Sequence, residues 1–587
     1  MKKQKTIAML LAVSFLFITG CQKPTENVYS EYVENMEIEV DNTSESDSSE
    51  SEPDNSFPSY NSDTVTSSET ASDDEKKNIK ILSVKDFGAV GDGKTDDGEA
   101  IAAAVKALYS CDEGSQLVFE KNKTYYVSGT TQNALNIVSL KGMTIDGNNS
   151  TILLDGTDKR TYLNLSECEN VTVKSFNFDL KVRSHFVGTV IGTYNRDEVG
   201  DYIDIKADRD FGSYDKYTYS GFTFGLVADP EGKTSRDFLM LKSFKTIDKN
   251  ARTYRFYLDF ESSMVGGTKV NTEKLKLNDT VILPTPEIAH NVTECVRVHT
   301  NSNCTLKDIN IWNAPCFMLS VRYNNGPITF ENVNTIPAPD EKVNFCSWRD
   351  VYHCKTNSDK IIWRNCKSSG NHDDVINISS NIMYVSKVYK NNEVECVWQE
   401  TNGSYGDPAP GSKVIVWDTD TGKLIGRTTL HRVVNSNTNH YIFKDNLRGI
   451  KEGENINITF ESDCAPNSEI INCDFEGTFR FHGGPLTVKD SLITAARLWI
   501  ESISNLEGPI PNNILFENCT FEKYKQYQTF LDIYSDHPRT DWQEGDYRLE
   551  NIRFVNCKGI SKSSFFENGN FDPNSPNYIT VTPNLAY

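Results

Sequence analysis

The feature that most constrains the fold is a pattern of short strands that recurs through most of the chain. Near residue 136 the sequence LNIVSLKGMTIDGNNSTILLDG alternates apolar with polar residues and turns at Gly or Asn. The pattern returns near residues 303 and 360 and appears last in RLENIRFVNCKGI. Hardly any segment after residue 110 has the period of an amphipathic helix. We therefore predict an all-β protein built on a parallel β-helix, in which each coil buries its neighbour's face.

Two stretches break this rhythm, residues 184–286 and residues 379–463. Both have longer strands and hairpin turns, such as GSKVIVWDTDTGKLIGRTTL in the second stretch. Each is long enough for a small antiparallel β-barrel inserted between coils. Inserts that emerge beside a site usually wall it. The β-helix itself is then predicted in three parts, which are residues 79–183, 287–378 and 464–587.

The N-terminus has the pattern of a bacterial export signal. Three lysines precede an apolar run from Ile7 to Ile18, which is too short to span a bilayer comfortably. The following Ile-Thr-Gly-Cys, ending at Cys21, resembles a lipobox. That resemblance implies removal of residues 1–20 and acylation of Cys21, and two or more acyl chains anchor a protein stably. We expect a lipoprotein held on the outer side of a bacterial membrane and exposed at the cell surface.

Residues 21–78 are rich in Ser, Glu, Asp and Asn. Between residues 22 and 77 there are 16 acidic residues and three lysines, a net charge of −13 out of the chain's −22. Such a segment cannot bury enough apolar surface to fold, so we expect a disordered tether. The remaining body is mildly acidic and has no basic stripe with interleaved aromatic residues, which argues against nucleic acid as a partner.

The cysteines favour a structural role over metal binding. Thirteen of the 14 cysteines remain once Cys21 is set aside, and an odd number argues against a complete disulfide framework. Cys366, Cys473, Cys519 and Cys557 each follow an asparagine in the repeat pattern, which is typical of small buried residues stacked between coils. No pair has CxxC spacing, and we predict no metal and no cofactor.

Residues 88–95 (GAVGDGKT) satisfy the phosphate-binding pattern GxxxxGK[ST]. We reject that function because Asp92, Asp96, Asp97 and Glu99 crowd the start of the following helix, where a phosphate would have to lie. The segment is instead similar to the opening sequence of the pectate-lyase superfamily of right-handed β-helices. That resemblance implies a helix that caps the first coil and covers an unpaired edge.

Acidic residues occur at two places about one repeat apart, here called the acidic stations: Asp350, and the pair Asp373 and Asp374. Positions one period apart lie over each other in a stacked repeat, so we expect the three carboxylates to converge. Like charges gathered in this way raise the pKa of one group and leave another low, which provides a proton donor beside a base. A proton donor beside a base is what the hydrolysis of a glycosidic bond requires. The alternatives are a solvated acidic edge or a calcium site.

The combination of a β-helix, two inserted barrels, D-x-x-H from Asp350 to His353, and the GxxDDxIN element containing Asp373 and Asp374 resembles glycoside hydrolase family 110. The resemblance implies an exo-acting, inverting α-1,3-galactosidase whose substrate is a glycan ending in α-galactose, including the blood-group B type. The chain departs from the family where DDAINxH is common, because Ser379 occupies the place of the histidine. This departure leaves the terminal sugar open, with N-acetylgalactosamine as an alternative.

We predict Asp373 as the general acid, with Asp350 and Asp374 positioning and deprotonating the water. An inverting pair of carboxyl groups lies roughly 6.5–9.5 Å apart, and coils are about 4.8 Å apart, so offset side chains on neighbouring coils can reach this distance. Adjacent strand residues point to opposite faces. A bend at Gly370-Asn371 is needed to bring both Asp373 and Asp374 to the surface.

Six further residues are candidates for substrate binding, each with an ordinary structural role as its alternative. Histidines beside the acidic stations can bond sugar hydroxyls, and a later coil supplies an aromatic ring that can stack on a sugar. The candidates are His353, His372, Arg480, His482, Trp499 and Glu501.

Three rival functions remain. A polygalacturonase-like hydrolase expects a GHG and an R-x-K element, but the chain has only His482-Gly483-Gly484 and no convincing R-x-K. A polysaccharide lyase needs a Lys or Arg base with calcium, and none stands beside the acidic stations. A surface glycan-binding protein on an inert β-helix would have no activity that depends on Asp373. No oligomeric state follows from the sequence.

Overall fold

The computed structural model describes residues 78–582 apart from several internal segments. The predicted signal, Cys21 and almost the whole of the predicted tether therefore lie outside the described residues. Within the described part, no helix is both long and apolar enough to cross a membrane. The internal segments not described are 129–132, 156–160, 210–214, 220–222, 229–231, 233–234, 259–274, 287–293, 400–407, 502–506, 524–532, 535–549 and 561–578.

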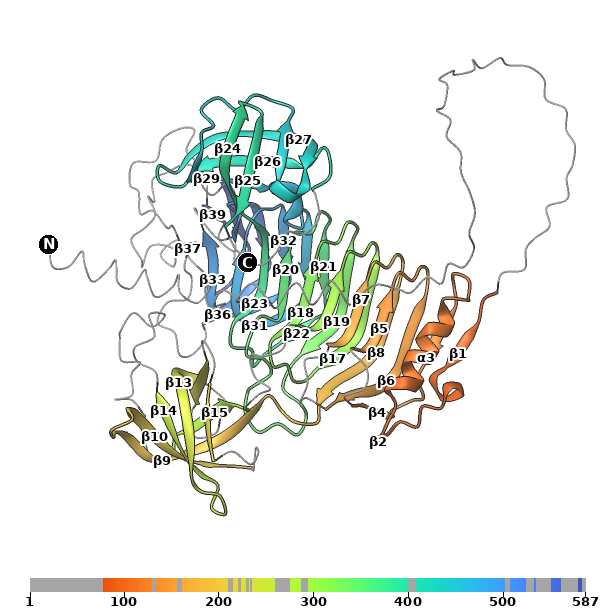
Figure 1. The fold of residues 1–587 in the computed structure, drawn as a ribbon, viewed down its shortest axis with the longest axis vertical. Helices are drawn as coiled ribbons and strands as arrows, with labels where there is room; N and C mark the ends of the chain where they lie inside the picture. Colours follow the sequence, from red (N-terminus) through yellow and green to blue (C-terminus); the bar gives the residue numbers. More distant parts are fainter. Residues whose placement is uncertain are drawn as a thin grey trace, which may run out of the picture.

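The chain forms the predicted parallel β-helix, which runs diagonally through Figure 1. Its strands pair in parallel as three stacks, here called stacks A, B and C. Stack A contains β5 (Asn133–Val138), β7 (Thr161–Ser166), β16 (Glu294–His299), β18 (Phe317–Arg322), β20 (Tyr352–Lys355), β23 (Asp374–Asn381), β31 (Asp474–Phe481), β33 (Leu492–Glu501) and β37 (Ile533–Tyr534).

Stacks B and C complete each coil, and several long strands bend to serve both. Stack B contains β1 (Ile81–Ser83), β3 (Gln116–Val118), β6 (Thr144–Leu154), β8 (Thr172–Leu180), β17 (Cys304–Ile311), β19 (Ile328–Thr335), β21 (Ile361–Arg364), β30 (Ser468–Ile471), β32 (Leu486–Lys489), β35 (Asn512–Glu517), β38 (Glu550–Val555) and β39 (Ile579–Thr582). Stack C contains β2 (Asp92–Asp96), β4 (Thr124–Val127), β22 (Lys367–Ser368), β36 (Thr520–Lys523) and the second halves of the long strands.

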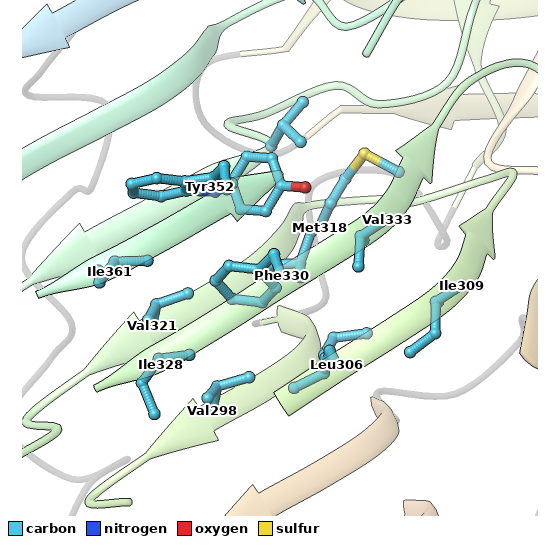
Figure 2. Packing of buried hydrophobic residues seen from close by; sticks show 14 of the residues in the cluster. Val298, Leu306, Ile309, Met318, Val321, Ile328, Phe330, Val333, Tyr352 and Ile361 are labelled. Atoms are coloured by element: carbon cyan, nitrogen blue, oxygen red, sulfur yellow. The ribbon is translucent and has the colours of Figure 1, made fainter. Parts of the chain in front are cut away.

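The interior of the coils is one continuous apolar core. Apolar side chains from successive coils lie above one another, as Val298 and Val321 do in stack A and Leu306 and Phe330 in stack B (Figure 2). All four are fully buried. Stacking of identical positions is what lets each coil bury the face of its neighbour, as the repeat predicts.

A buried asparagine ladder closes one turn of the central coils. Asn324 donates from Nδ2 to Val298 O at 2.9 Å and to Asn357 Oδ1 at 2.8 Å, and its own Oδ1 accepts the backbone N–H of Asn301 at 2.8 Å. Asn301, Asn324 and Asn357 are each at most 1% exposed. Their amides satisfy backbone groups that a tight turn would otherwise leave buried without partners.

At the N-terminal end, α3 (Gly98–Leu108) covers the first coil, as predicted (Figure 1). Its apolar face, including Ile101 and Leu108, packs into the main core. The preceding Asp97 carboxylate accepts the backbone N–H groups of Val90 and Gly91, at 2.7 and 3.1 Å. Because these loop amides are already bonded to a carboxylate, they are not a phosphate cradle, which supports the rejection of nucleotide binding.

Both breaks in the repeat are antiparallel barrels, and they lie on opposite sides of the β-helix in Figure 1. In the first, the pairing of β13 with β14 closes the ring of the described strands, and β11 extends it at β13. The first barrel contains β9 (His185–Arg196), β10 (Asp201–Ala207), β11 (Lys216–Thr218), β12 (Phe224–Ala228), β13 (Ser235–Asp248), β14 (Thr253–Leu258) and β15 (Thr280–Pro284). The second, a closed barrel, contains β24 (Met383–Lys390), β25 (Glu393–Trp398), β26 (Lys413–Asp418), β27 (Lys423–Asn435), β28 (His440–Phe443) and β29 (Gly453–Phe460).

The repeat cysteines are stacked between coils as predicted. Cys366, Cys473 and Cys519 are buried, whereas Cys557 is half-buried. The Cys366 thiol donates to Phe330 O on the preceding coil at 3.4 Å. All thirteen cysteines in the described part are free thiols.

Candidate active site

The acidic residues meet where β20 and β23 lie side by side in stack A. Tyr352 pairs with Ile376 and His353 with Asn377, so the coil period here is 24 residues. The same register aligns Asp350 with Asp374, and the Val351 N–H donates to Asp374 O at 2.9 Å. The predicted convergence of the two stations therefore follows directly from strand pairing.

Asp373 and Asp374 reach the same region because the chain bends just before β23. Gly370 has φ +71°, and a Cβ there would lie 2.9 Å from Phe345 N, so the turn requires glycine. Asn371 Nδ2 then donates to Asp373 O at 3.0 Å, which holds Asp373 outside the strand. The pairing of β23 with β31 also shifts register after Asp374. These irregularities provide the bend that the sequence required.

The three carboxylates form a tight cluster. One oxygen from each of Asp350, Asp373 and Asp374 lies within 4.8 Å of the others. The Asp350 and Asp374 side chains are 6% and 7% exposed, whereas that of Asp373 is 28% exposed. Asp373 is therefore the member of the cluster most open to a molecule arriving from solvent.

The electrostatics of the cluster favour protonation near neutral pH. Burial, and then the neighbouring Asp350 charge, raise the pKa of Asp373 to about 7. Burial, and then the charge of Glu507, raise the pKa of Asp350 to about 6. Burial also raises the pKa of Asp374 well above its usual range, although Arg480 opposes the shift. Since three like charges cannot all form at this spacing, at least one carboxyl keeps its proton.

His353 is tied to Asp350 across the D-x-x-H spacing. Its Nδ1 lies 2.6 Å from Asp350 Oδ2, and its ring stacks on Phe317 with centroids 4.4 Å apart. Burial and then the Arg322 charge lower the pKa of His353 well below its ordinary value, so the imidazole is neutral. The pair fixes the direction in which the Asp350 carboxylate points.

Behind the aspartates lies a buried charged network. Arg480 Nε is 3.3 Å from Asp374 Oδ2, and Arg480 Nη1 donates to Glu507 Oε2 at 2.8 Å. Lys355 Nζ lies 2.6 Å from Glu507 Oε1. Asn377 Nδ2 lies between the two carboxylates, 3.2 Å from Asp374 Oδ2 and 3.3 Å from Glu507 Oε1. All five side chains are almost fully buried.

The other predicted site residues lie in different surroundings. His482 is 3% exposed with Nε2 4.0 Å from Glu507 Oε2, and burial lowers its pKa to about 3. His372 turns away from the cluster and stacks on Phe345, with centroids 5.4 Å apart. Trp499 pairs with Arg480 in the strand register, and Glu501 is two residues further along β33, but their side chains lie outside the described part.

Ser379 is also buried. It occupies the position at which glycoside hydrolase family 110, which the sequence resembles, commonly has a histidine. Its hydroxyl donates to Asn377 Oδ1 at 3.0 Å. It thereby helps to orient the amide that contacts Asp374. The departure in sequence is therefore accommodated within the network, without an unpaired polar group.

Sequence reasoning missed Arg349, Lys355 and Glu507 as members of the site. Arg349 Nη1 lies 3.5 Å from Asp373 Oδ2 and adjoins Asp350 in the chain, so its position was a usable signal. Lys355 follows His353 by two residues on the same outward face of β20. Glu507 carried no signal, because β34 (Glu507–Gly508) reaches the site only through antiparallel pairing with the end of β23.

Both barrels contact the chain beside the cluster. Trp348, two residues before Asp350, donates from Nε1 to Ser184 O at 3.1 Å, where the first barrel begins. Thr459 of the second barrel donates to Asn381 O at 2.8 Å, at the end of the strand that carries Asp374. Each barrel thus contacts one of the two chain segments that carry the aspartates.

The convergence of three carboxylates also raises the calcium alternative. Ca²⁺ takes about 6–8 oxygen ligands. Here the guanidinium groups of Arg349 and Arg480 already lie within 3.5 and 3.3 Å of Asp373 and Asp374. Cations of the protein in these positions disfavour a bound metal ion, and the donor set fits proton transfer better.

Comparison with known proteins gives one curated relative and a group of solved structures. No family model matches the chain. The sequence is 21% identical over 524 residues to α-1,3-galactosidase B of Bacteroides thetaiotaomicron, covering 81% of this chain and 82% of the relative. Recognition of a resemblance to α-1,3-galactosidases from the motifs is thereby confirmed.

The solved structures that the comparison found include two enzymes. The endo-xylogalacturonan hydrolase of Aspergillus tubingensis is 12% identical with a TM-score of 0.35, covering 86% of this chain and 99% of the other. The polygalacturonase of Erwinia carotovora is 12% identical with a TM-score of 0.30, covering 88% and 100%.

Proposed function

We propose that the protein is a glycoside hydrolase whose chemistry is performed by Asp350, Asp373 and Asp374. The observation that carries the proposal is the cluster itself, in which an oxygen of each carboxylate lies within 4.8 Å of the others. A glycosidase needs one protonated and one ionised carboxyl group at neutral pH. Burial and mutual repulsion favour the protonated carboxyl group, and the cations that flank the cluster favour the ionised one.

In the proposed reaction Asp373 is the general acid. It is the most accessible carboxyl of the cluster, and the pKa raised to about 7 keeps a proton available for the leaving oxygen. Asp350 and Asp374 hold a water by hydrogen bonds, and Asp350, whose pKa of about 6 leaves it ionised near neutral pH, removes its proton as it attacks the anomeric carbon. His353 orients Asp350, while Arg480 and Asn377 orient Asp374.

For the substrate we propose a terminal α-1,3-linked galactose, removed with inversion to give β-galactose. The relative named α-1,3-galactosidase B and the GxxDDxIN and D-x-x-H elements support this specificity. One oxygen of each carboxylate lies within 4.8 Å of the others, which is closer than the roughly 6.5–9.5 Å between the carboxyl groups of an inverting pair. The anomer of the product therefore tests the stereochemistry directly.

The test is hydrolysis of a small panel with the product read by NMR. The panel contains galactosyl-α-1,3-galactose, the branched B trisaccharide, the α-N-acetylgalactosamine analogues of both, and oligogalacturonate. Release of β-galactose from the α-galactosides is the expected result. Release of α-galactose would overturn inversion, and cleavage of oligogalacturonate alone would replace the substrate with a polyuronate. No cleavage in the panel would leave a glycan-binding protein as the better reading.

We also propose that the enzyme works at the cell surface, anchored through Cys21 and held off the membrane by residues 22–77. The lipobox-like Ile18-Thr19-Gly20-Cys21 and the net charge of −13 on the tether support this. Such a tether would let the β-helix reach glycans beyond the envelope.

A further inference from the structure

Glu507 is a buried carboxylate that the proposed reaction does not use. It lies on β34, which pairs antiparallel with the last residues of β23, so it enters the site from outside the coil repeat. Its side chain is 4% exposed. Although burial opposes ionisation, Lys355 and Arg480 hold the pKa of Glu507 well below its usual range, so it carries a full charge.

Two contact paths connect this charge to Asp374. The first runs through Arg480, whose Nη1 contacts Glu507 at 2.8 Å and whose Nε lies 3.3 Å from Asp374. The second runs through Asn377, whose Nδ2 lies 3.3 Å from Glu507 and 3.2 Å from Asp374. A guanidinium has a planar fork of donors, so anchoring one nitrogen on Glu507 fixes where the others point.

Glu507 also acts on Asp350 without touching it. Its negative charge is the largest influence on the Asp350 pKa after burial, and it raises that pKa. Lys355, which lies 2.6 Å from Glu507, lowers the pKa of the same group. Lys355 and Glu507 therefore shift the pKa of Asp350 in opposite directions.

We propose that Glu507 is a positioning residue of the proposed hydrolysis: it anchors Arg480, Asn377 and Lys355 so that Asp374 and Asp350 are held in the positions that bind the attacking water and remove its proton. A buried ion pair of this kind adds little stability compared with well-packed apolar residues. The role that its geometry supports is the placement of charge in the centre of the site. This inference rests on the proposed function, and its test is chosen to be separable from it.

The test compares Glu507→Gln with Glu294→Gln, a matched change. Glu294 is likewise a buried carboxylate, paired with Arg297 at 2.8 Å, but it lies at the start of β16 in stack A, two strands before β20. For Glu507→Gln we expect kcat to fall about 10²-fold, as for a displaced catalytic group, with little change in KM. The acidic limb of the kcat/KM profile should move to lower pH. Glu294→Gln should leave both unchanged.

Lys355→Gln should move the acidic limb of the pH profile in the opposite direction to Glu507→Gln. Because Lys355 lowers the pKa of Asp350, its removal should move the acidic limb to higher pH. A role confined to folding would lower activity in both variants without moving the limbs in opposite directions. Parallel shifts, or an unchanged profile and kcat in Glu507→Gln, would overturn the inference.

A second measurement does not need activity. Carboxyl carbons of ¹³C-labelled aspartate are titrated by NMR in the wild type and the three variants, with Asp350 assigned by Asp350→Asn. A lower Asp350 midpoint in Glu507→Gln and a higher one in Lys355→Gln support the inference even if no glycoside is cleaved. Equal midpoints in folded proteins overturn it, and an inactive wild type with shifted midpoints overturns only the proposed function.

Discussion

The chemistry assigned to the aspartates depends on small differences among three neighbouring side chains. Asp373 lies outside β23 and is 28% exposed, whereas Asp350 and Asp374 are held by His353 and Arg480 in the buried part of the cluster. A group that must meet the leaving oxygen needs access, and a group that must activate water needs a fixed direction. The exposure of Asp373 therefore fits the role of general acid, and the contacts of Asp350 and Asp374 fit the role of holding the water.

Asp373→Asn tests the acid role. A general acid contributes about 10²–10⁴-fold, so kcat on a disaccharide should fall by that factor while the circular dichroism spectrum and Tm remain close to wild type. An aryl α-galactoside with an acidic phenol needs no protonation of its leaving group, so its hydrolysis should be affected much less. Near-normal activity on the disaccharide would contradict the assignment. Asp350→Asn and Asp374→Asn should abolish turnover of both substrates.

The pH profile follows from the same pKa shifts. Asp350 must be ionised to act on water, and its pKa of about 6 sets the acidic limb. Asp373 must be protonated to act as acid, and its pKa of about 7 sets the alkaline limb. We therefore expect a narrow bell with its optimum between about pH 6 and 7 in kcat/KM. The limbs belong to the coupled cluster, so Asp373→Asn should move the acidic limb as well as remove the alkaline one. A flat profile from pH 5 to 8 would contradict this.

Sequence reasoning succeeded for residues whose position in the repeat determines their place in space. Asp350 and Asp374 pair because β20 and β23 are neighbouring strands, and the spacing of 24 residues is readable in the chain. His372, which follows the bend at Gly370, stacks on Phe345, a contact that the repeat pattern does not predict. Glu507 could not be found, since its approach depends on one antiparallel pairing that has no repeat signature.

At the level of elements, the coils contain a buried polar ladder in addition to the apolar core. The strands and turns of the β-helix were predictable because alternation and turn residues are local properties. The two inserts were predictable only as interruptions. The order in which their strands pair follows from long-range packing, and the closure of each barrel is seen only in the structure.

Asn324→Ala tests the buried ladder. The change leaves the carbonyl of Val298 and the Asn301 N–H without their bonds to Asn324. Each buried unsatisfied group costs about 1–3 kcal/mol, so the free energy of unfolding should fall by at least that amount. Asn325→Ala is the matched control, because Asn325 is the exposed neighbour of Asn324 in the same turn, and its effect should stay within about 0.5 kcal/mol. Equal midpoints of denaturant unfolding for the two variants would contradict a structural role for the ladder.

At the level of the whole molecule, the catalytic body and the proposed anchor are separate parts of the chain. Every residue of the proposed site lies between Arg349 and Glu507, and the helix α3 closes the β-helix on the side toward the tether. Residues 22–77, the proposed tether, carry a net charge of −13 and include none of the residues of the proposed site. The tether should therefore control where the enzyme acts while leaving the chemistry of the site unchanged.

Removal of residues 1–77 tests this separation. The shortened protein should be soluble and should hydrolyse a small α-galactoside with a kcat/KM within about twofold of the full chain, because no described contact of the site involves the removed residues. Cys21→Ser in the full chain should abolish labelling by radioactive palmitate and release the protein from the membrane fraction, since the acyl chains supply the membrane affinity. Both forms should lose activity toward glycans on intact cells only through reduced local concentration. A kcat/KM reduced more than tenfold on the small substrate would show that the tether contributes to the site.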